Sequence, residues 1–239
     1  MASKRAILCV DVGGTRVKAG AFDQRGVARS NRHELGTPRP ATPVAIERAI
    51  VNLAKSVQGE LGDRALDACS IGFPGVVRSN IVYSAPNLDG PWTRVRLGEK
   101  VATKLGVPVR MRNDAGVQGA GLISGAGVEL VLTFGTGLGC ALYTDGTYAP
   151  NIELGHHVFR GKTTYEEFVC DKSLKRIGAI AWGKRVKEIL PPILALFNPD
   201  RLYLGGGNAR LFEKQDFKLA YPVTIGSNDA GLSGGVKLW

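Results

Sequence analysis

The sequence lacks a long hydrophobic run: no stretch of about 18 consecutive apolar residues occurs, so neither a membrane-spanning helix nor a membrane partner is expected. Cysteine is scarce, with four residues and no Cys-X-X-Cys spacing, which disfavours a disulfide framework. Near the start, the strand-like stretch 6–10 runs directly into Asp11 and two glycines, unlike the apolar core of a signal peptide. These absences favour a cytoplasmic protein with reduced thiols.

Acidic residues are also outnumbered: 31 Lys or Arg face 21 Asp or Glu, for a formal net charge of +10. The basic residues bunch between Lys162 and Lys187. Such a surface either keeps a protein soluble or attracts an anionic partner, and the sequence leaves both readings open. Because no basic stripe interleaved with aromatic residues and no base-reading module is present, nucleic acid is not expected as the partner.

The most informative stretch of the chain runs from Val131 to His157. The apolar residues Val131, Leu132 and Phe134 lead into the glycine-rich turn 135–137, and a second apolar run at 140–143 ends at an Asp-Gly turn. This pattern predicts a strand, a tight turn and a second strand. Glycines at the turn let backbone N–H groups approach an anion closely, although a plain hairpin turn explains the stretch equally well when it is taken alone.

A weak internal repeat strengthens the anion-binding interpretation. Residues 11–15, Asp-Val-Gly-Gly-Thr, align with residues 133–137, Thr-Phe-Gly-Thr-Gly, at a constant offset of 122 residues. At the same offset Ala19 aligns with Ala141 and Asp23 with Asp145. A repeat of about half the chain predicts two similar domains rather than a solenoid. We place them at 1–112 and 113–239, with the last residues allowed to return to the first domain. Two such turns would form a two-sided clamp for a phosphate chain.

Asp11 ends the first predicted strand, directly beside the first glycine turn. A carboxylate next to a phosphate is unfavourable unless a cation lies between them, which suggests Mg²⁺ bound directly or through water. The alternative is an Asx-turn residue that closes the hairpin. Lys18 alternates with apolar neighbours and could point toward the same anion.

Asn113 and Asp114 follow the predicted strand 107–111 and precede a segment of small residues, 115–125. Asn or Asp before a helix is the usual N-cap. A carboxylate at a strand end is also well placed to act as a general base, and the two interpretations are compatible.

Further along, Glu153 and His156 are separated by Leu and Gly, a spacing that suits either a metal pair or a clamp for sugar hydroxyls. Only Cys170 could complete a zinc site, so zinc is not expected. Residues 205–208, Gly-Gly-Gly-Asn, follow the predicted strand 201–204. They form either a strand-to-helix junction or a surface on which a flat purine base could lie. Helices are expected at 44–61, 95–105, 115–125, 165–176 and 179–197, the last interrupted by Pro191 and Pro192.

With these residues in hand, the chain resembles the actin-like sugar kinases. Asp11–Thr15 is similar to their first phosphate motif, Phe134–Gly139 to the second, and Leu204–Asn208 to the adenosine motif. Asn113-Asp114 and Glu153–His156 are similar to the catalytic and sugar-binding motifs of the ROK (repressor, ORF, kinase) subfamily. The resemblance implies two related α/β domains of the actin-like, or ribonuclease H-like, type. Each would be a mixed sheet flanked by helices, with the active site in the interdomain cleft.

Four more stretches, 37–43, 73–77, 132–136 and 197–201, point to the polyphosphate glucokinase branch of that subfamily. Two features depart from the wider family. The cysteine-rich zinc motif found in many ROK proteins after the position of His156 is absent, as it is in this branch, and family members usually continue past the position of Trp239 into a longer closing helix.

The resemblance implies a role for each matching residue. Asp114 would accept the proton of the reacting hydroxyl, and Asp11 would order Mg²⁺. The sugar would contact Gly75, Asn87, Asn113, Asp114, Glu153 and His156. The phosphates and the nucleotide would contact Asp11, Gly13, Gly14, Thr15, Lys18, Thr133, Gly135, Thr136, Gly137, Gly205, Gly206, Gly207 and Asn208.

The implied reaction is transfer of a phosphoryl group from inorganic polyphosphate, ATP or both to the 6-hydroxyl of glucose, by a homodimer. The alternatives are an ATP-dependent hexokinase for mannose or another hexose, and a sugar-binding regulator without catalysis. Regulators of this family carry an N-terminal helix-turn-helix, for which the first strand, expected from residue 6, leaves no room.

Overall fold

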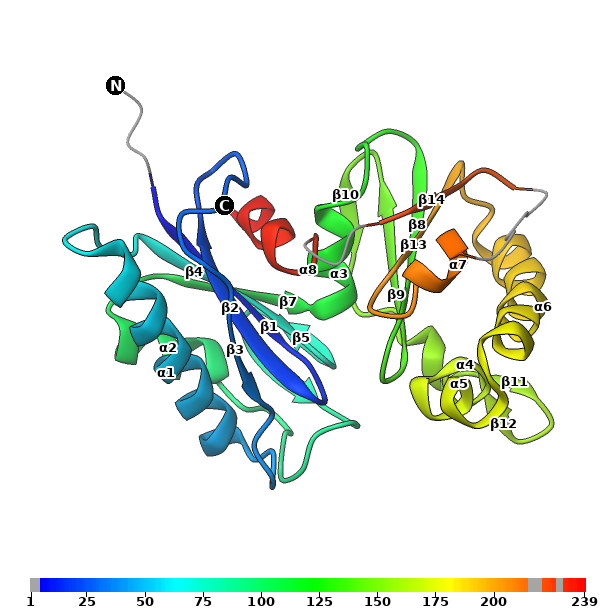
Figure 1. The fold of residues 1–239 in the computed structure, drawn as a ribbon, viewed down its shortest axis with the longest axis horizontal. Helices are drawn as coiled ribbons and strands as arrows, with labels where there is room; N and C mark the ends of the chain where they lie inside the picture. The colour runs from blue at the N-terminus through cyan, green and yellow to red at the C-terminus, as the bar shows by residue number, and fades with distance from the viewer. Residues whose placement is uncertain (1–4, 215–220, 227–229) are drawn as a thin grey trace. The chain divides into compact units, whose positions relative to one another are not determined.

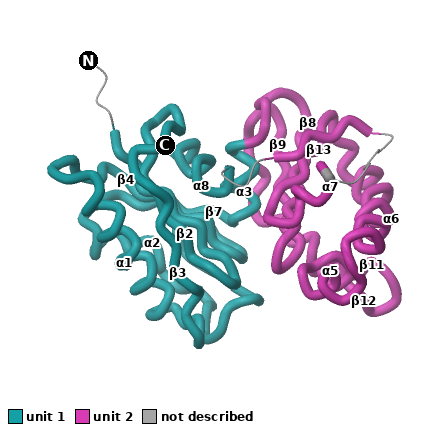
Figure 2. The backbone as a smooth tube through the Cα atoms, viewed as in Figure 1, with its two compact units in different colours: residues 1–121, 229–239 teal, residues 122–228 magenta. Residues whose placement is uncertain are grey.

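The computed structural model describes residues 5–214, 221–226 and 230–239, and these form two compact units. Unit 1 contains Met1–Gly121 and Asp229–Trp239, and unit 2 contains Leu122–Asn228 (Figure 2). The chain therefore divides after Gly121, whereas the sequence placed the boundary at 112/113. The physical reason lies in helix α3 (Asp114–Ala120), which packs against the C-terminal helices α8 (Ala230–Ser233) and η2 (Gly234–Leu238). A Cβ on Gly234 would lie 2.1 Å from the carbonyl oxygen of Val117, so this approach requires glycine.

Unit 1 is built on a five-stranded mixed sheet with the order β3-β2-β1-β4-β7 (Figure 1). Its strands are β1 (Ile7–Val12), β2 (Arg16–Phe22), β3 (His33–Gly36), β4 (Ala68–Phe73) and β7 (Val109–Asn113). Strands β2 and β3 run antiparallel to their neighbours, while β1, β4 and β7 are parallel. A small hairpin, β5 (Val76–Arg78) and β6 (Ile81–Ser84), follows β4.

Alternation along β1 decides which helices cover each face of this sheet. Leu8 and Val10 point into the core formed with α1 (Pro43–Leu61) and α2 (Leu97–Leu105). Ile7 and Cys9 point to the opposite face, where they pack against Leu232 of α8 and its neighbours. The C-terminal segment therefore completes the core of unit 1.

Unit 2 repeats the same plan, with the strand order β10-β9-β8-β13-β14. Its main strands are β8 (Val128–Phe134), β9 (Leu138–Thr144), β10 (Thr147–Ala149), β13 (Arg201–Gly205) and β14 (Val223–Ile225). The helices are η1 (Leu154–His156), α4 (Tyr165–Val169), α5 (Asp171–Ile177), α6 (Ala179–Phe197) and α7 (Arg210–Lys214). A two-stranded ribbon, β11 (Val158–Arg160) and β12 (Thr163–Thr164), precedes α4.

The internal repeat is a repeat of structure. Strand β1 ends at Val12 and β8 ends at Phe134, 122 residues later; β2 and β9 begin at Arg16 and Leu138, again 122 residues apart. In both units the hairpin is followed by a strand that pairs in parallel with its first strand, β4 in unit 1 and β13 in unit 2. The predicted fold class, two related α/β parts with mixed sheets and flanking helices, is confirmed.

Three helices differ from their predicted extents. Helix α3 ends at Ala120, and the helix expected at 165–176 is divided at Cys170 into α4 and α5. Helix α6 runs through Pro191 and Pro192 without interruption. The predicted break is wrong because burial of the apolar face of α6 against the core outweighs the loss of backbone hydrogen bonds at the prolines. Among the described residues, no helix combines the length and the apolar character needed to cross a membrane.

Candidate functional site

The first glycine turn, Gly13–Thr15, joins β1 to β2 and is held from outside by the segment that follows β3. The Thr37 hydroxyl donates a hydrogen bond to the carbonyl oxygen of Gly13 at 2.6 Å, and the Thr37 N–H donates to that of Thr15 at 2.9 Å. The guanidinium of Arg39 donates to the carbonyl oxygen of Gly14 at 2.8 Å. All three turn carbonyls therefore bond to this segment, which fixes the shape of the turn.

Thr37 and Arg39 were not among the predicted site residues. Their segment is anchored in turn by Asp89, whose carboxylate accepts a hydrogen bond from the Ala41 N–H at 2.7 Å and lies 3.5 Å from Arg39. The backbone hydrogen bond from Ala41 is the main reason that the pKa of Asp89 lies below its ordinary value. The available signal was the unusual composition of residues 37–43, which contributed to the sequence analysis only as part of the family resemblance.

Asp11 lies on β1 directly opposite Lys18 of β2 in the antiparallel register. The Lys18 ammonium is 3.5 Å from the Asp11 carboxylate, and the two side chains are 34% and 23% exposed. Removal from water raises the pKa of Asp11 above its ordinary value, and the nearby ammonium opposes that rise. Asp11 is thus a desolvated carboxylate that a cation would stabilise.

The parallel strands of unit 1 bring the other predicted residues to the same edge of the sheet. Asp11 pairs with Gly72 of β4, and Phe73 at the end of β4 pairs with Asn113 at the end of β7. A Cβ on Gly72 would lie in ordinary van der Waals contact, 3.5 Å from the Cα of Asp114, so the start of α3 packs directly on β4. The carboxyl ends of parallel strands are the usual location of ligand sites in such folds.

Asn113 is the N-cap of α3, as predicted. Its side-chain oxygen accepts hydrogen bonds from the N–H groups of Ala115 and Gly116, at 3.0 and 3.3 Å. Its amide nitrogen donates to the carbonyl oxygen of Gly75 at 3.2 Å. Gly75 has φ of +153°, and a Cβ there would lie 2.0 Å from the carbonyl oxygen of Ser84, so only glycine fits.

Asp114 is the first residue of α3, half-buried, and its carboxylate accepts a hydrogen bond from the Ala115 N–H at 2.8 Å. Unit 1 therefore gathers Asp11, Gly75, Asn113 and Asp114 at one sheet edge. Asn87 lies in the loop after β6 and is exposed.

The second glycine turn, Gly135–Gly137, joins β8 to β9 in unit 2. The N–H of Asp171, the first residue of α5, donates to the carbonyl oxygen of Gly135 at 2.9 Å. Beside the turn lies the carboxylate of Glu166, which accepts a hydrogen bond from the Leu138 N–H at 3.2 Å. A Cβ on Gly137 would lie 2.0 Å from that carboxylate, so this glycine admits Glu166, a residue that the sequence reading missed.

The third glycine turn packs onto the second. Gly205 pairs with Thr133 in the parallel register of β13 and β8. Gly206 has φ of +84°, a Cβ there would meet the carbonyl oxygen of Phe134 at 2.4 Å, and the Asn208 N–H donates to the same oxygen at 3.0 Å. The Asn208 side-chain nitrogen is buried and has no hydrogen-bond partner among the described residues. Predicted phosphate and adenosine residues are thus adjacent within unit 2.

Glu153 precedes η1 and His156 is its last residue, with 3.7 Å between the His156 Nε2 and a Glu153 carboxylate oxygen. Removal from water is the main cause that raises the pKa of Glu153; His156 opposes the shift and Glu166 adds to it. Burial, with a smaller effect of Glu153, raises the pKa of Cys140 to about 12, so this thiol is neutral. Among the described residues, no three His, Cys, Asp or Glu side chains gather as a metal site.

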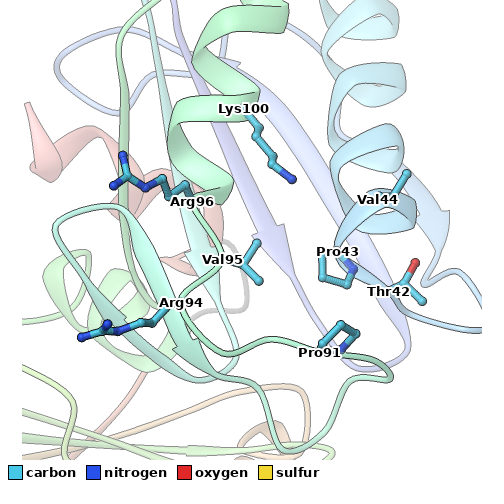
Figure 3. Close-up of a pocket in the computed structure, with 8 residues that line it drawn as sticks. All are labelled: Thr42, Pro43, Val44, Pro91, Arg94, Val95, Arg96 and Lys100. Carbon is cyan, nitrogen blue, oxygen red and sulfur yellow. The ribbon is translucent and has the colours of Figure 1, made fainter.

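A pocket of about 560 Å³ lies in unit 1, between the start of α1 and the start of α2. It is lined by Thr42, Pro43, Val44, Pro91, Arg94, Val95, Arg96 and Lys100, none of which is a predicted site residue. Figure 3 shows Lys100 extending toward Pro43, while the guanidinium groups of Arg94 and Arg96 point away. The pocket therefore offers mainly apolar walls and one cation.

Comparison with known proteins gives consistent results. The chain is 33% identical over 218 residues to the polyphosphate glucokinase of Mycobacterium tuberculosis (strain ATCC 25177 / H37Ra), an alignment that covers 86% of this chain and 78% of that protein. Its fold is similar to that of the inorganic polyphosphate/ATP-glucomannokinase from Arthrobacter sp. strain KM, with a TM-score of 0.89, 27% identity and 97% of each chain covered. A ROK family glucokinase from Streptomyces griseus, solved with glucose and AMPPNP, has the same fold with a TM-score of 0.81 and 22% identity over 98% of each chain.

The family assignment rests on sequence as well as on fold. The model of the ROK family matches residues 7–165, which is more than half of the chain and includes the Asp11, Asn113 and Glu153 motifs. This chain therefore belongs to the ROK family.

Proposed function

We propose that this protein is a sugar kinase, which transfers a phosphoryl group from inorganic polyphosphate or ATP to the 6-hydroxyl of glucose. The observation that carries the proposal is the 33% identity, over 86% of the chain, to a protein named polyphosphate glucokinase. The similarity to a polyphosphate/ATP-glucomannokinase at 27% identity supports the same donors.

The predicted site residues have two roles in the proposed reaction, proton transfer and sugar binding. Asp114 accepts the proton of the attacking hydroxyl. Its carboxylate stands at the start of α3, and since Asn113 is the N-cap of this helix, Asp114 is not required for that role. In unit 1, Asn87 and Asn113 hydrogen-bond sugar hydroxyls, with the backbone of Gly75 nearby. In unit 2, Glu153 and His156 have the same proposed role. A ring of polar partners discriminates strongly against sugars that lack a hydroxyl, because the unpaired partners then lose their hydrogen bonds.

The glycine turns bind the donor. Backbone N–H groups of Gly13, Gly14 and Thr15 in unit 1, and of Gly135–Gly137 in unit 2, cradle phosphate oxygens without side chains in the way. Lys18 supplies a positive charge beside the first turn, and Thr133 borders the second. Gly205–Asn208 accommodate the adenosine when ATP is the donor, and the buried amide nitrogen of Asn208 is a donor that this role could use.

The residues of unit 1 fit a magnesium ion held by few protein ligands. Mg²⁺ keeps several waters and binds proteins through one or two carboxylates together with substrate phosphates, so no dedicated cage is needed. Asp11 provides one desolvated carboxylate beside the first phosphate turn, and it would hold the ion directly or through water. When bound, Mg²⁺ neutralises charge on the transferring phosphates.

A coupled assay of glucose 6-phosphate formation, with ATP and inorganic polyphosphate in parallel, tests the proposal. Turnover with both donors, or with polyphosphate alone, is the expected result, and mannose in place of glucose measures the sugar preference. Absence of phosphorylation of glucose, mannose and glucosamine with either donor would contradict it and would favour a sugar-binding regulator. Sedimentation analysis of the purified chain tests the homodimer that the resemblance predicts.

A further inference from the structure

Positive charge is concentrated on α5 and on the first half of α6 in unit 2. Between residues 172 and 187 the chain contains six Lys or Arg and not one Asp or Glu. These six are Lys172, Lys175, Arg176, Lys184, Arg185 and Lys187. A solvated helix face usually mixes both signs, because like charges one turn apart repel each other. This run of a single sign therefore calls for a specific explanation.

Two of the six cations stabilise the fold. The Lys175 ammonium lies 2.6 Å from the Asp171 carboxylate on the same helix. Arg185 is half-buried: its guanidinium donates to the carbonyl oxygen of Phe168 at 3.2 Å and to the Ser173 hydroxyl at 2.9 Å, and stacks over the Phe168 ring at 4.4 Å. These contacts join α4, α5 and α6, so the two helices that carry the cations are packed against each other.

Three others, Lys172, Arg176 and Lys184, have exposed side chains. Among the ion pairs between described residues, none involves any of these three. We name this set the cationic surface. Because their charges face water and are not neutralised by neighbouring carboxylates, they remain available to an external anion.

The cationic surface begins at the second phosphate turn. The first N–H of α5, that of Asp171, donates to the carbonyl oxygen of Gly135 at 2.9 Å, and Lys172 is the next residue. From there α5 extends for about 10 Å at 1.5 Å per residue, and the chain continues into α6. Lys172 and Arg176 are four residues apart and therefore lie on one side of α5, the helix that begins next to the Gly135–Gly137 turn.

We infer that the cationic surface binds the part of an inorganic polyphosphate chain that extends beyond the phosphoryl group being transferred. This inference rests on the proposed function and specifies where the long donor is held. A linear polyanion binds through many weak phosphate contacts and releases counterions, so it needs exposed cations rather than a closed pocket. ATP has only three phosphates, so it makes fewer such contacts and depends less on exposed cations.

The test compares wild type with the triple variant Lys172→Gln, Arg176→Gln, Lys184→Gln. Arg48→Gln, Lys55→Gln, Lys104→Gln is the matched control, because it removes three exposed cations from α1 and α2 of unit 1. Binding of long-chain sodium polyphosphate is measured by titration without sugar across a salt series, and KM is measured for long-chain polyphosphate, tripolyphosphate and ATP. Three lost phosphate contacts at about 0.7 each reduce the slope of log affinity against log salt by about 2. Between 50 and 200 mM salt, wild-type affinity then falls about fifteen-fold more than that of the variant.

The expected result is a rise in KM that is larger for long-chain polyphosphate than for ATP in the triple variant, with the control behaving as wild type. Wild-type salt dependence in the triple variant would overturn the inference, even if polyphosphate supports turnover. Tighter binding of single-stranded DNA than of polyphosphate of equal charge would also overturn it, by assigning the surface to nucleic acid. The opposite case is also distinguishable. If polyphosphate binding needs these cations but only ATP supports turnover, the cationic surface is confirmed as a polyphosphate-binding surface. The proposal that polyphosphate is the phosphoryl donor is then refuted.

Discussion

Replacing Asp114 by Asn removes one negative charge and changes the size and shape of the side chain very little. The Asp114 carboxylate accepts a hydrogen bond from the Ala115 N–H at 2.8 Å, and the amide oxygen of an Asn can accept the same bond. Asn113 remains the N-cap of α3, with its two hydrogen bonds to the helix backbone. The variant therefore separates the chemistry of the carboxylate from its structural role.

The expected effects on stability and on turnover differ widely in size. Loss of a negative charge in the first turn of a helix costs about 0.3–1 kcal/mol of stability. Loss of a general base slows the chemical step by about a hundredfold to ten-thousandfold. At about 1.4 kcal/mol per factor of ten, that is about 3–5 kcal/mol of activation free energy. The activation free energy should thus rise several times more than the free energy of unfolding falls.

The assay measures kcat for glucose with each donor, together with the thermal unfolding midpoint. Because the base acts on the sugar hydroxyl, kcat should fall by a similar factor with polyphosphate and with ATP. Asp63→Asn, which neutralises an exposed carboxylate of unit 1 after α1, is the control and should retain wild-type turnover. A folded Asp114→Asn enzyme with turnover within a few-fold of wild type would refute the assignment of the base.

Three further substitutions test other parts of the structure. Desolvation raises the pKa of Asp11, so the ionised form is disfavoured in the folded state. Asp11→Asn should therefore raise the melting temperature at neutral pH, and this gain should disappear below the ordinary aspartate pKa. Magnesium-dependent turnover should fall, and an unchanged turnover would argue against the metal role. His156→Ala should raise KM for glucose without changing the metal content, and stoichiometric zinc in the wild type by elemental analysis would contradict that expectation. Trp239→Ala removes a 2.8 Å hydrogen bond to Ser70 and a 4.2 Å stacking contact with Arg110. Denaturant titration should show a loss of about 2–4 kcal/mol of unfolding free energy. A loss below about 1 kcal/mol, the value of one exposed contact, would mean that the C-terminal segment does not stabilise unit 1.

Features encoded by neighbouring residues could be predicted from the sequence. The hairpin around Gly13 and that around Gly135 follow from alternating apolar residues and glycines within a dozen positions. The capping of α3 by Asn113 follows from a polar residue at the junction of a strand and a helix. The similarity of the two sheets could also be predicted, because matching residues occur at a constant offset of 122 in the sequence.

Contacts between distant parts of the chain could not be predicted. The Ser70 hydroxyl donates to the carbonyl oxygen of Gly235 at 2.6 Å, a bond between residues 165 positions apart that holds the C-terminal segment to the sheet of unit 1. Similarly, Thr37 and Arg39 contact the first glycine turn only because β3 returns the chain to it. No periodicity or spacing in the sequence marks such pairs, since they depend on the completed topology.

The two glycine turns share a backbone plan but differ in the charge of their neighbours. Beside the first turn the structure has the guanidinium of Arg39 and the ammonium of Lys18, one facing the backbone and one facing Asp11. Beside the second turn it has the carboxylate of Glu166, which occupies the Leu138 N–H. A phosphate at the second turn would meet that negative charge, and Coulomb repulsion at such distances is strong where water is partly excluded. The exposed cations of α5 begin at Lys172, the residue after Asp171, so they supply the charge that the second turn itself lacks. Binding of a polyanion in unit 2 therefore depends on α5 and α6 as well as on the glycines, whereas in unit 1 the cations stand at the turn.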